Sequence, residues 1–305
     1  MKVRGRIGVP ALAVALAILA LAPPVASAAQ TLERIRDRHS ITFAYRDKAL
    51  PFSFAGRDKQ PRGYSVELCE RIARAIQRQL GLAALDVRWI AVDADMRLEA
   101  VATGRADAEC GTTTIALSRM QQVDFSLPIF VDGGALLVRA RSPVQRAADL
   151  DGRRVAVIRG TTTERALSGA LNLAGARAAI VPVTNPEDGA SAVREGRADA
   201  YAGDRLVLTG LAMAADEGKP ATADAGKFPA ADGGKLAVLP DDISVEPYAI
   251  VVRRDDSDFR LAVNRALVEL YKRGEIDAIF KHWLAPLGNP SALLNAMWYL
   301  NALPE

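Results

Sequence analysis

A short segment occurs twice in this 305-residue chain, and the repeat constrains the fold more than any other sequence feature. Residues 101–111 read VATGRADAECG, and residues 193–203 read VREGRADAYAG, 92 positions later. Each copy has the pattern of a helix end, a glycine turn and a short strand. Two copies are too few for a solenoid, so the repeat favours two lobes of similar architecture. Chance similarity between alanine-rich segments is the alternative explanation.

Predicted strands and helices alternate along the chain, which is typical of an α/β protein with mostly parallel sheets. Residues 65–80 show this most clearly, because their apolar positions form one helical stripe that stops at Gly81. Strands are predicted at residues 41–45, 85–92, 106–110, 153–158, 177–183, 236–239 and 247–253. Helices are predicted at residues 65–80, 94–103, 161–171, 188–195 and 258–284, the last as one or two helices.

The repeat and the alternation together predict where the two lobes lie in the chain. The first lobe is placed at residues 29–135 plus 246–305, because the strand at 247–253 returns the chain to it. The second lobe is placed at residues 136–245. Residues 214–234 are rich in Gly, Ala, Asp and Lys and are interpreted as a surface loop. A helix that docks on the core is expected within residues 287–305.

The first 28 residues have the three parts of a secretory signal peptide. Three basic residues (Lys2, Arg4 and Arg6) precede an apolar run at 7–22, and small residues follow at 25–29. The apolar run is shorter than the ~20 residues that span a membrane, although a membrane anchor is the alternative interpretation. We therefore expect an exported, soluble mature protein in the periplasm, which is an oxidising compartment.

Charge and cysteine content exclude several classes of function. Without the predicted signal the chain has 36 basic and 36 acidic residues, so electrostatic capture of nucleic acid is not expected. Two cysteines and two histidines are too few for a dense disulfide scaffold or a zinc cluster, and no metal or cofactor is predicted. Cys69 and Cys110 are either a disulfide or two buried thiols, and the sequence leaves both possibilities open.

Polar side chains follow several predicted strands, and open α/β sheets bind ligands at that edge. Arg46 follows the first strand, Thr112 and Arg119 follow the strand at 106–110, and Asp204 comes after residues 199–202. Residues 161–163 are threonines that open a helix, whose unpaired N–H groups suit an anion. Helix capping alone is the alternative role for these threonines. Because arginine donates two parallel hydrogen bonds to a carboxylate, we predict a small anion held between the lobes.

Several short motifs also occur in a characteristic order. They are Arg46 with PFSF at 51–54, Gly63-Tyr64, ECGTTT at 109–114 with Arg119, FSLPIF at 125–130, ADLDG at 148–152, GTT at 160–162, and GEI with KHW at 274–283. Their order and spacing resemble the family 3 periplasmic solute-binding proteins of bacterial amino-acid uptake systems, and the glutamate/aspartate-binding branch most closely. The resemblance implies a two-lobed periplasmic-binding-protein fold of type II, with two mixed sheets, flanking helices and a hinge.

The resemblance also assigns roles to individual residues. Arg119 matches the position that binds the α-carboxylate of the ligand, and Thr114 and Thr162 match positions that assist it. Thr112 and Asp204 match positions that take the α-ammonium group. These five positions would hold the part of the ligand that all amino acids share.

Two further positions concern the side chain of the ligand. Arg46 and Arg97 match positions that hold the side-chain carboxylate in the acidic-ligand branch. The chain departs from that branch at Ala94, where a serine is usual, and at Pro186, where a histidine is usual. Both departures concern groups that would contact the distal carboxylate. Ser65 also replaces the acid usual after Gly-Tyr.

Charge counting supports an acidic ligand without the resemblance. Arg46, Arg97, Arg119 and Asp204 sum to +2, whereas a neutral amino acid uses one cation and one anion. Together with this charge count, the resemblance implies a monomeric, non-catalytic protein that delivers glutamate or aspartate to the membrane permease of an ABC transporter. The alternatives are an exported enzyme similar to cyclohexadienyl dehydratases, with Glu109 as its general acid, and a soluble ligand sensor.

Overall fold

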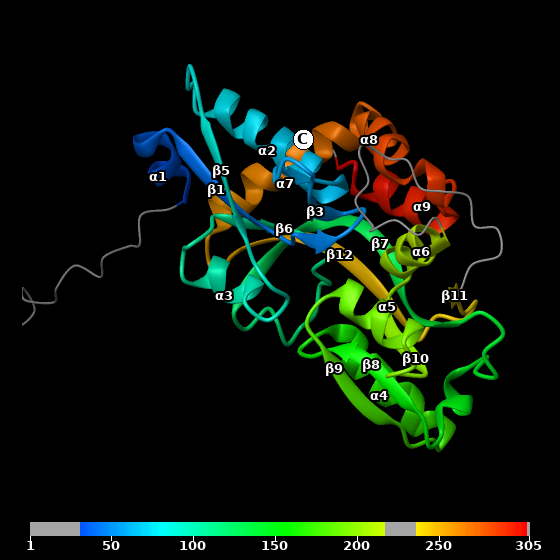
Figure 1. Ribbon diagram of the computed structural model, residues 1–305. Coiled ribbons are helices and arrows are strands. Elements are labelled where there is room, and N and C mark those ends of the chain that lie inside the picture. Colours follow the sequence, from blue (N-terminus) through cyan, green and yellow to red (C-terminus); the bar gives the residue numbers. More distant parts are fainter. Residues whose placement is uncertain (1–30, 217–235, 304–305) are drawn as a thin grey trace, which may run out of the picture.

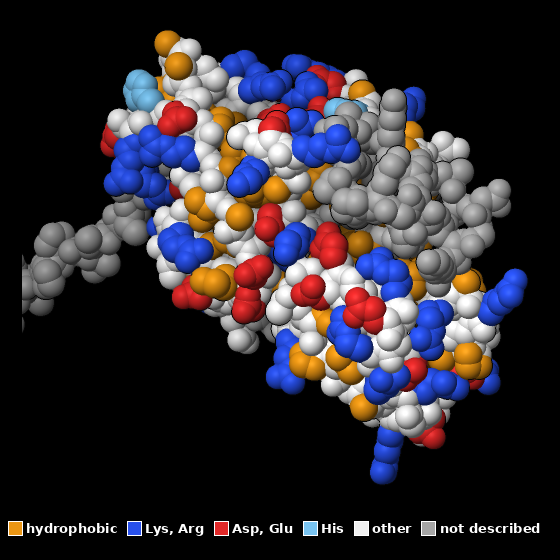
Figure 2. Space-filling view, in the orientation of Figure 1, with side chains coloured by type: hydrophobic (Ala, Val, Ile, Leu, Met, Phe, Trp, Pro, Cys, Tyr) orange, Lys and Arg blue, Asp and Glu red, His pale blue; other side chains and the backbone are white. Residues whose placement is uncertain are grey.

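The predicted alternation of strands and helices extends through the residues that the computed structural model describes, 31–216 and 236–303. Two lobes are visible in Figure 1, one containing β1, β5 and β6 and the other containing β8, β9 and β10. The predicted signal peptide at 1–28 and most of the predicted loop at 214–234 lie outside the described residues. On the face shown in Figure 2, basic and acidic side chains are interspersed, as the near-zero net charge predicts.

One nine-stranded sheet runs through both lobes, in the order β5-β1-β6-β12-β7-β10-β8-β9, with β11 paired to β7. Its strands are β1 (Ser40–Tyr45), β5 (Asp86–Ala91), β6 (Ala108–Cys110), β7 (Val123–Arg139), β8 (Arg154–Ile158), β9 (Ala179–Val183), β10 (Ala200–Asp204), β11 (Leu236–Val238) and β12 (Ser244–Arg253). β1 is parallel to β5 and β6, and β8 is parallel to β9 and β10, whereas β7 is antiparallel to its neighbours. The two mixed sheets expected from the family are therefore the two halves of one sheet.

Helices cover both halves of this sheet. Around β1 and β6 pack α1 (Thr31–Arg38), α2 (Tyr64–Gln79) and α3 (Arg97–Ala102). Further along the sheet α7 (Ser257–Lys272) and α9 (Ala292–Asn301) pack against β7, and α8 (Glu275–Leu284) packs against α2 and α7. Against the other strands pack α4 (Thr162–Ala174), α5 (Pro186–Arg194) and α6 (Arg205–Asp216). A small antiparallel sheet joins β2 (Lys48–Ala49), β3 (Ser53–Ala55) and β4 (Pro61–Arg62). The helix expected near the C-terminus is confirmed as α9, which buries Leu294, Met297 and Trp298.

The long strands β7 and β12 connect the two lobes, and sequence patterns did not predict β7. Its Pro128 and the pair Gly133-Gly134 resemble strand breakers. In the structure Pro128 lies beside a register shift, because Tyr248 pairs with Phe130 and the next residue pairs with Pro128. A β-bulge of this kind tolerates a proline. At Gly133 the carboxylate of Asp242 lies close to the backbone, where a Cβ would have to displace it.

The sequence repeat is confirmed as a structural repeat. Asp107 and Asp199 occupy equivalent positions, each just before the short strand of its copy. The backbone N–H of Asp107 donates to Thr42 O, and its carboxylate accepts from Thr42 N. Asp199 makes the same two hydrogen bonds with Arg154, the corresponding residue of β8. Each aspartate thus fixes the start of its strand beside a parallel neighbour, so chance similarity does not explain the repeat.

The helical stripe at 65–80 forms the main core of the first half of the sheet. α2 buries Leu68, Ile72 and Ile76 against the face of the sheet that carries Phe43. α3 covers the opposite face, which carries Ala44. Cys69 of α2 and Cys110 of β6 form a disulfide, so they are not the two buried thiols that the sequence also allowed.

Replacing both cysteines by alanine should lower the free energy of unfolding by about 4 kcal/mol, because the bond closes a loop with a sequence separation of 41 residues. Urea denaturation of the wild type and the Cys69→Ala/Cys110→Ala variant measures this difference. The single Cys69→Ala variant should lose a similar amount. An unchanged free energy of unfolding in the double variant would contradict the stabilising role of the bond.

Candidate ligand-binding site

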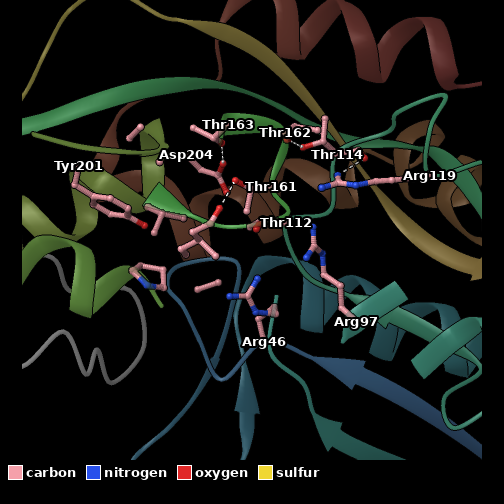
Figure 3. A pocket seen from close by; sticks show the side chains of 16 residues that line it. Arg46, Arg97, Thr112, Thr114, Arg119, Thr161, Thr162, Thr163, Tyr201 and Asp204 are labelled. Carbon is pink, nitrogen blue, oxygen red and sulfur yellow. Dashed lines mark hydrogen bonds between the residues drawn. The ribbon is translucent and has the colours of Figure 1, made fainter. Parts of the chain in front are cut away.

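A cavity lies where the two halves of the sheet meet, at the carboxyl ends of β1, β6, β8 and β10, as parallel strands predict. Figure 3 shows arginines reaching into it from one side and threonines with Asp204 facing them from the other. The lining residues are Arg46, Ala49, Arg97, Thr112, Thr114, Arg119, Ile158, Thr161, Thr162, Thr163, Pro186, Tyr201, Ala202, Gly203, Asp204 and Val207.

Three buried arginines form one wall. Arg46 follows β1, Arg97 begins α3, and Arg119 lies in the turn before β7, and each is at most 8% exposed. Arg97 Nε donates to Thr113 Oγ1 at 2.8 Å, and Arg119 donates to Thr114 O at 2.8 Å. The Arg46 side chain makes no hydrogen bond to a residue that the structure describes. Within residues 31–216 and 236–303, none of the three forms an ion pair, although buried charges are normally paired.

The arginines destabilise one another's charges. Burial lowers the pKa of Arg97 to about 9, and repulsion from Arg119 and Arg46 adds to the shift, which Glu109 and Asp204 oppose. Burial also lowers the pKa of Arg119, with a further contribution from Arg165. Three cations are thus held close together in a buried site, where an anion would be strongly attracted.

The opposite wall is formed by the start of α4 and the end of β10. Thr161 caps α4, since its hydroxyl accepts a hydrogen bond from Glu164 N, and the Glu164 carboxylate accepts one from Gly160 N. The capping role considered from the sequence is therefore real, and it leaves Thr162 and Thr163 free to face the cavity. Thr163 Oγ1 lies 3.4 Å from Asp204 Oδ1.

Asp204 is the one acidic side chain among the cavity-lining residues. Burial, together with the nearby charge of Glu246, raises the pKa of Asp204 to about 6. Both effects would be relieved by a cation beside this carboxylate. In the sequence repeat Asp204 corresponds to Thr112, which lies 92 positions earlier, so the two copies bring equivalent positions to one cavity.

Glu246 of β12 belongs to the site but was missed from the sequence. Its Oε2 accepts hydrogen bonds from Thr114 Oγ1 at 2.6 Å and Thr162 Oγ1 at 2.7 Å, and the two hydroxyls lie 3.1 Å apart. Ser244 Oγ donates to the other carboxylate oxygen. Glu246 is 1% exposed and connects the loop after β6 to α4 across the cavity. Its only sequence signal was an acid immediately before a predicted apolar strand, and that signal is common at surfaces.

The charge count made from the sequence was incomplete for this reason. It omitted Glu246 and also Glu109, a fully buried residue of β6 next to the arginines. Burial raises the pKa of Glu109, whereas the charges of Arg97, Arg46 and Arg119 oppose the shift. Counting the carboxylates of Asp204 and Glu246 against the three arginines gives +1 rather than +2, before the buried Glu109 is counted.

All seven residues singled out from the sequence line the cavity: Arg46, Arg97, Thr112, Thr114, Arg119, Thr162 and Asp204. Among the departures from the family pattern, Pro186 lines this cavity, whereas Ala94 lines a separate one beside Arg159. Tyr201 and Val207, which sequence reasoning missed, add apolar surface from β10 and α6. The roles of the seven predicted residues in ligand binding remain predictions.

Two lobes joined by two long strands, with a charged cavity between them, define a protein that encloses a small solute. The sequence pattern of the bacterial extracellular solute-binding proteins, family 3, matches residues 41–286, and the chain belongs to this family. The L-glutamate/L-aspartate-binding protein of Pseudomonas aeruginosa is 32% identical over 273 residues, covering 86% of this chain and 82% of the relative. A glutamate/aspartate import solute-binding protein of Escherichia coli is 28% identical, covering 84% and 80%.

A solved structure is also similar. An ancestral amino-acid-binding protein, a precursor of cyclohexadienyl dehydratase, superposes with a TM-score of 0.68 at 25% identity, covering 84% of this chain and 99% of that one. Within the described part of this chain, no helix has the length and apolar character needed to cross a membrane. The same residues contain no group of three or more His, Cys, Asp or Glu side chains arranged to hold a metal ion.

A buried carboxyl group on one of the strands that connect the lobes provides a test of how burial and nearby charges shift pKa values in this region. Asp132 of β7 accepts hydrogen bonds from Gly133 N, Leu206 N and Tyr248 Oη of β12. Burial raises the pKa of Asp132 to about 7, and repulsion from Asp204 contributes. The folded state therefore binds this proton more tightly than the unfolded chain, so the contribution of Asp132 to stability is lost as pH rises from about 4 to 7.

The Asp132→Asn variant has no titratable group at this position, so its stability should not show this dependence on pH. The free energy of unfolding of the variant minus that of the wild type should increase by on the order of 1–3 kcal/mol between pH 4 and pH 7. Urea denaturation at several pH values measures it, with the exposed Asp241→Asn as the matched control. A difference that does not change with pH would contradict the raised pKa.

Proposed function

We propose that the protein binds an acidic amino acid, glutamate or aspartate, between its two lobes. The observation that supports this most directly is the wall of three buried arginines without ion pairs in the described structure. A dicarboxylate would supply the missing anions, and guanidinium groups suit carboxylates because they donate two parallel hydrogen bonds. Two of the relatives reported above carry this specificity in their names.

The orientation of the ligand follows from the position of each charge. Arg119 lies beside Thr114 and Thr162, so we place the α-carboxylate there. The α-ammonium group lies near Asp204 and Thr112, where a cation relieves the unfavourable burial of the aspartate. Arg46 and Arg97 then remain for the side-chain carboxylate. Pro186 and Tyr201 limit the space beside it.

Delivery to a membrane permease of an ABC transporter completes the proposed function. The ligand would contact both lobes, so it favours the closed arrangement, and β7 and β12 would act as the hinge. We propose lobe boundaries at residues 29–135 plus 246–305 and 136–245, since β7 and β12 cross between the halves of the sheet near these points. Export to the periplasm as a monomer fits the family of extracellular proteins and the disulfide.

A binding protein without catalysis is favoured over an enzyme on the same scaffold. The enzyme alternative assigned the role of general acid to Glu109. This residue is fully buried beneath the arginines and is not among the residues that line the cavity. A general acid must reach the proton acceptor on its substrate, and Glu109 lacks that access.

Arg46→Ala should weaken glutamate binding by about 10- to 150-fold, since a charge-assisted hydrogen bond contributes about 1.5–3 kcal/mol. The ligand-free variant should be at least as stable as the wild type, because the substitution removes a buried charge that has no partner. Isothermal titration calorimetry with glutamate measures the first effect, and thermal unfolding without ligand measures the second.

The exposed Arg177→Ala serves as the matched control and should bind glutamate as the wild type does. Unchanged glutamate affinity in Arg46→Ala would remove this residue from the site. If the wild type binds neither glutamate nor aspartate, the proposed ligand class is wrong.

A further inference from the structure

Glu109 lies under the floor of the cavity and has no role so far. Its register partners are Ala44 on β1 and Val251 on β12, which lie in the apolar cluster that α3 covers. A side chain at Gly111 would collide with Glu109 Oε1, so the carboxyl group lies against the backbone of the loop that supplies Thr112. The carboxyl group is therefore next to the binding loop but shielded from solvent.

Neither carboxylate oxygen of Glu109 has a donor in normal hydrogen-bond geometry among the described residues, although the nearby Thr113 hydroxyl favours the ionised form. A fully buried carboxyl group is normally hydrogen-bonded or paired, and an unpaired one favours its neutral form. By contrast, the carboxylate oxygens of Glu246 accept three hydrogen bonds from hydroxyl groups. The two buried glutamates of the site thus lie in opposite environments.

The charges that act most strongly on Glu109 among the described residues are cationic. They are Arg97 of α3, Arg46 at the end of β1 and Arg119 in the turn before β7, whereas its register partner on β12 is the apolar Val251. These arginines oppose the effect of burial and stabilise the ionised form. They are also the groups proposed to bind the carboxylates of the ligand. Once a ligand carboxylate lies against them, their field at Glu109 weakens.

The net charge of the whole site also indicates that an acidic ligand favours the neutral form of Glu109. With Glu109, Asp204 and Glu246 all ionised, three carboxylates balance three arginines and the empty site is neutral. An acidic amino acid carries a net charge of −1 and would leave that site with one excess negative charge. Protonation of Glu109 removes the excess, whereas a neutral amino acid requires no proton.

From this juxtaposition we infer that Glu109 takes up a proton when the site binds an acidic amino acid, so that ligand and proton bind together. The inference rests on the proposed function. The proton comes from solvent and forms an O–H bond on a Glu109 carboxylate oxygen, and no other bond changes. Glu109 thereby acts as a specificity-determining residue that does not touch the ligand: its neutral form favours acidic ligands and its ionised form favours neutral ones.

Calorimetric titration in buffers with different ionisation enthalpies counts the protons bound with the ligand. Between pH 6 and pH 8 the wild type should take up at least about 0.3 protons more per glutamate than Glu109→Gln does. Subtracting the variant cancels the titration of Asp204 and Asp132, which both proteins share. Glu70→Gln, on the far side of α2, is the matched control and should behave as the wild type.

Equal proton uptake in the wild type and Glu109→Gln would overturn the inference while leaving glutamate binding intact. Failure of the wild type to bind any acidic amino acid would instead overturn the proposed function. If Glu109→Gln does not unfold cooperatively, the pH dependence of ligand binding by the wild type tests the inference instead. Its glutamate affinity should fall between pH 7 and pH 9 more steeply than its glutamine affinity, by up to about tenfold per pH unit, and parallel slopes would overturn the inference.

Discussion

Burial of three guanidinium groups in one cavity is the physical constraint on which the rest of the structure depends. An isolated charge is destabilised when it leaves water, and three like charges also repel one another. The fold tolerates Arg46, Arg97 and Arg119 only because carboxylates lie at a longer distance and hydroxyls lie close by. This unfavourable arrangement lowers the stability of the empty protein but increases its attraction for an anion.

The architecture explains how charges distant in sequence reach one place. Parallel strands on both halves of the sheet end at the same cavity, and the structural repeat brings Thr112 and Asp204 to corresponding positions. β7 and β12 cross between the halves and carry Asp132 and Glu246. Glu246 holds the loop after β6 against α4, so the strands that connect the lobes also contribute directly to the chemistry of the site.

Much of this arrangement was predictable, and what was missed has physical causes. The repeat, the amphipathic helix α2 and the polar residues after each strand depend on local patterns that the sequence displays directly. Glu246 and Glu109 were missed as charges of the site because burial depends on which strands pair, and that is a long-range property. The strand β7 escaped prediction because Pro128 is accommodated by a bulge that exists only once β12 is paired.

The central claim is that the buried arginines select a second carboxylate on the ligand. Glutamate and glutamine have nearly the same shape and differ by one charged group, so comparing their affinities for the wild-type protein tests this claim most directly. The account predicts that glutamate binds at least about 100-fold more tightly, since glutamine would leave a guanidinium group buried without its anion. Equal affinities, or tighter binding of glutamine, would contradict it.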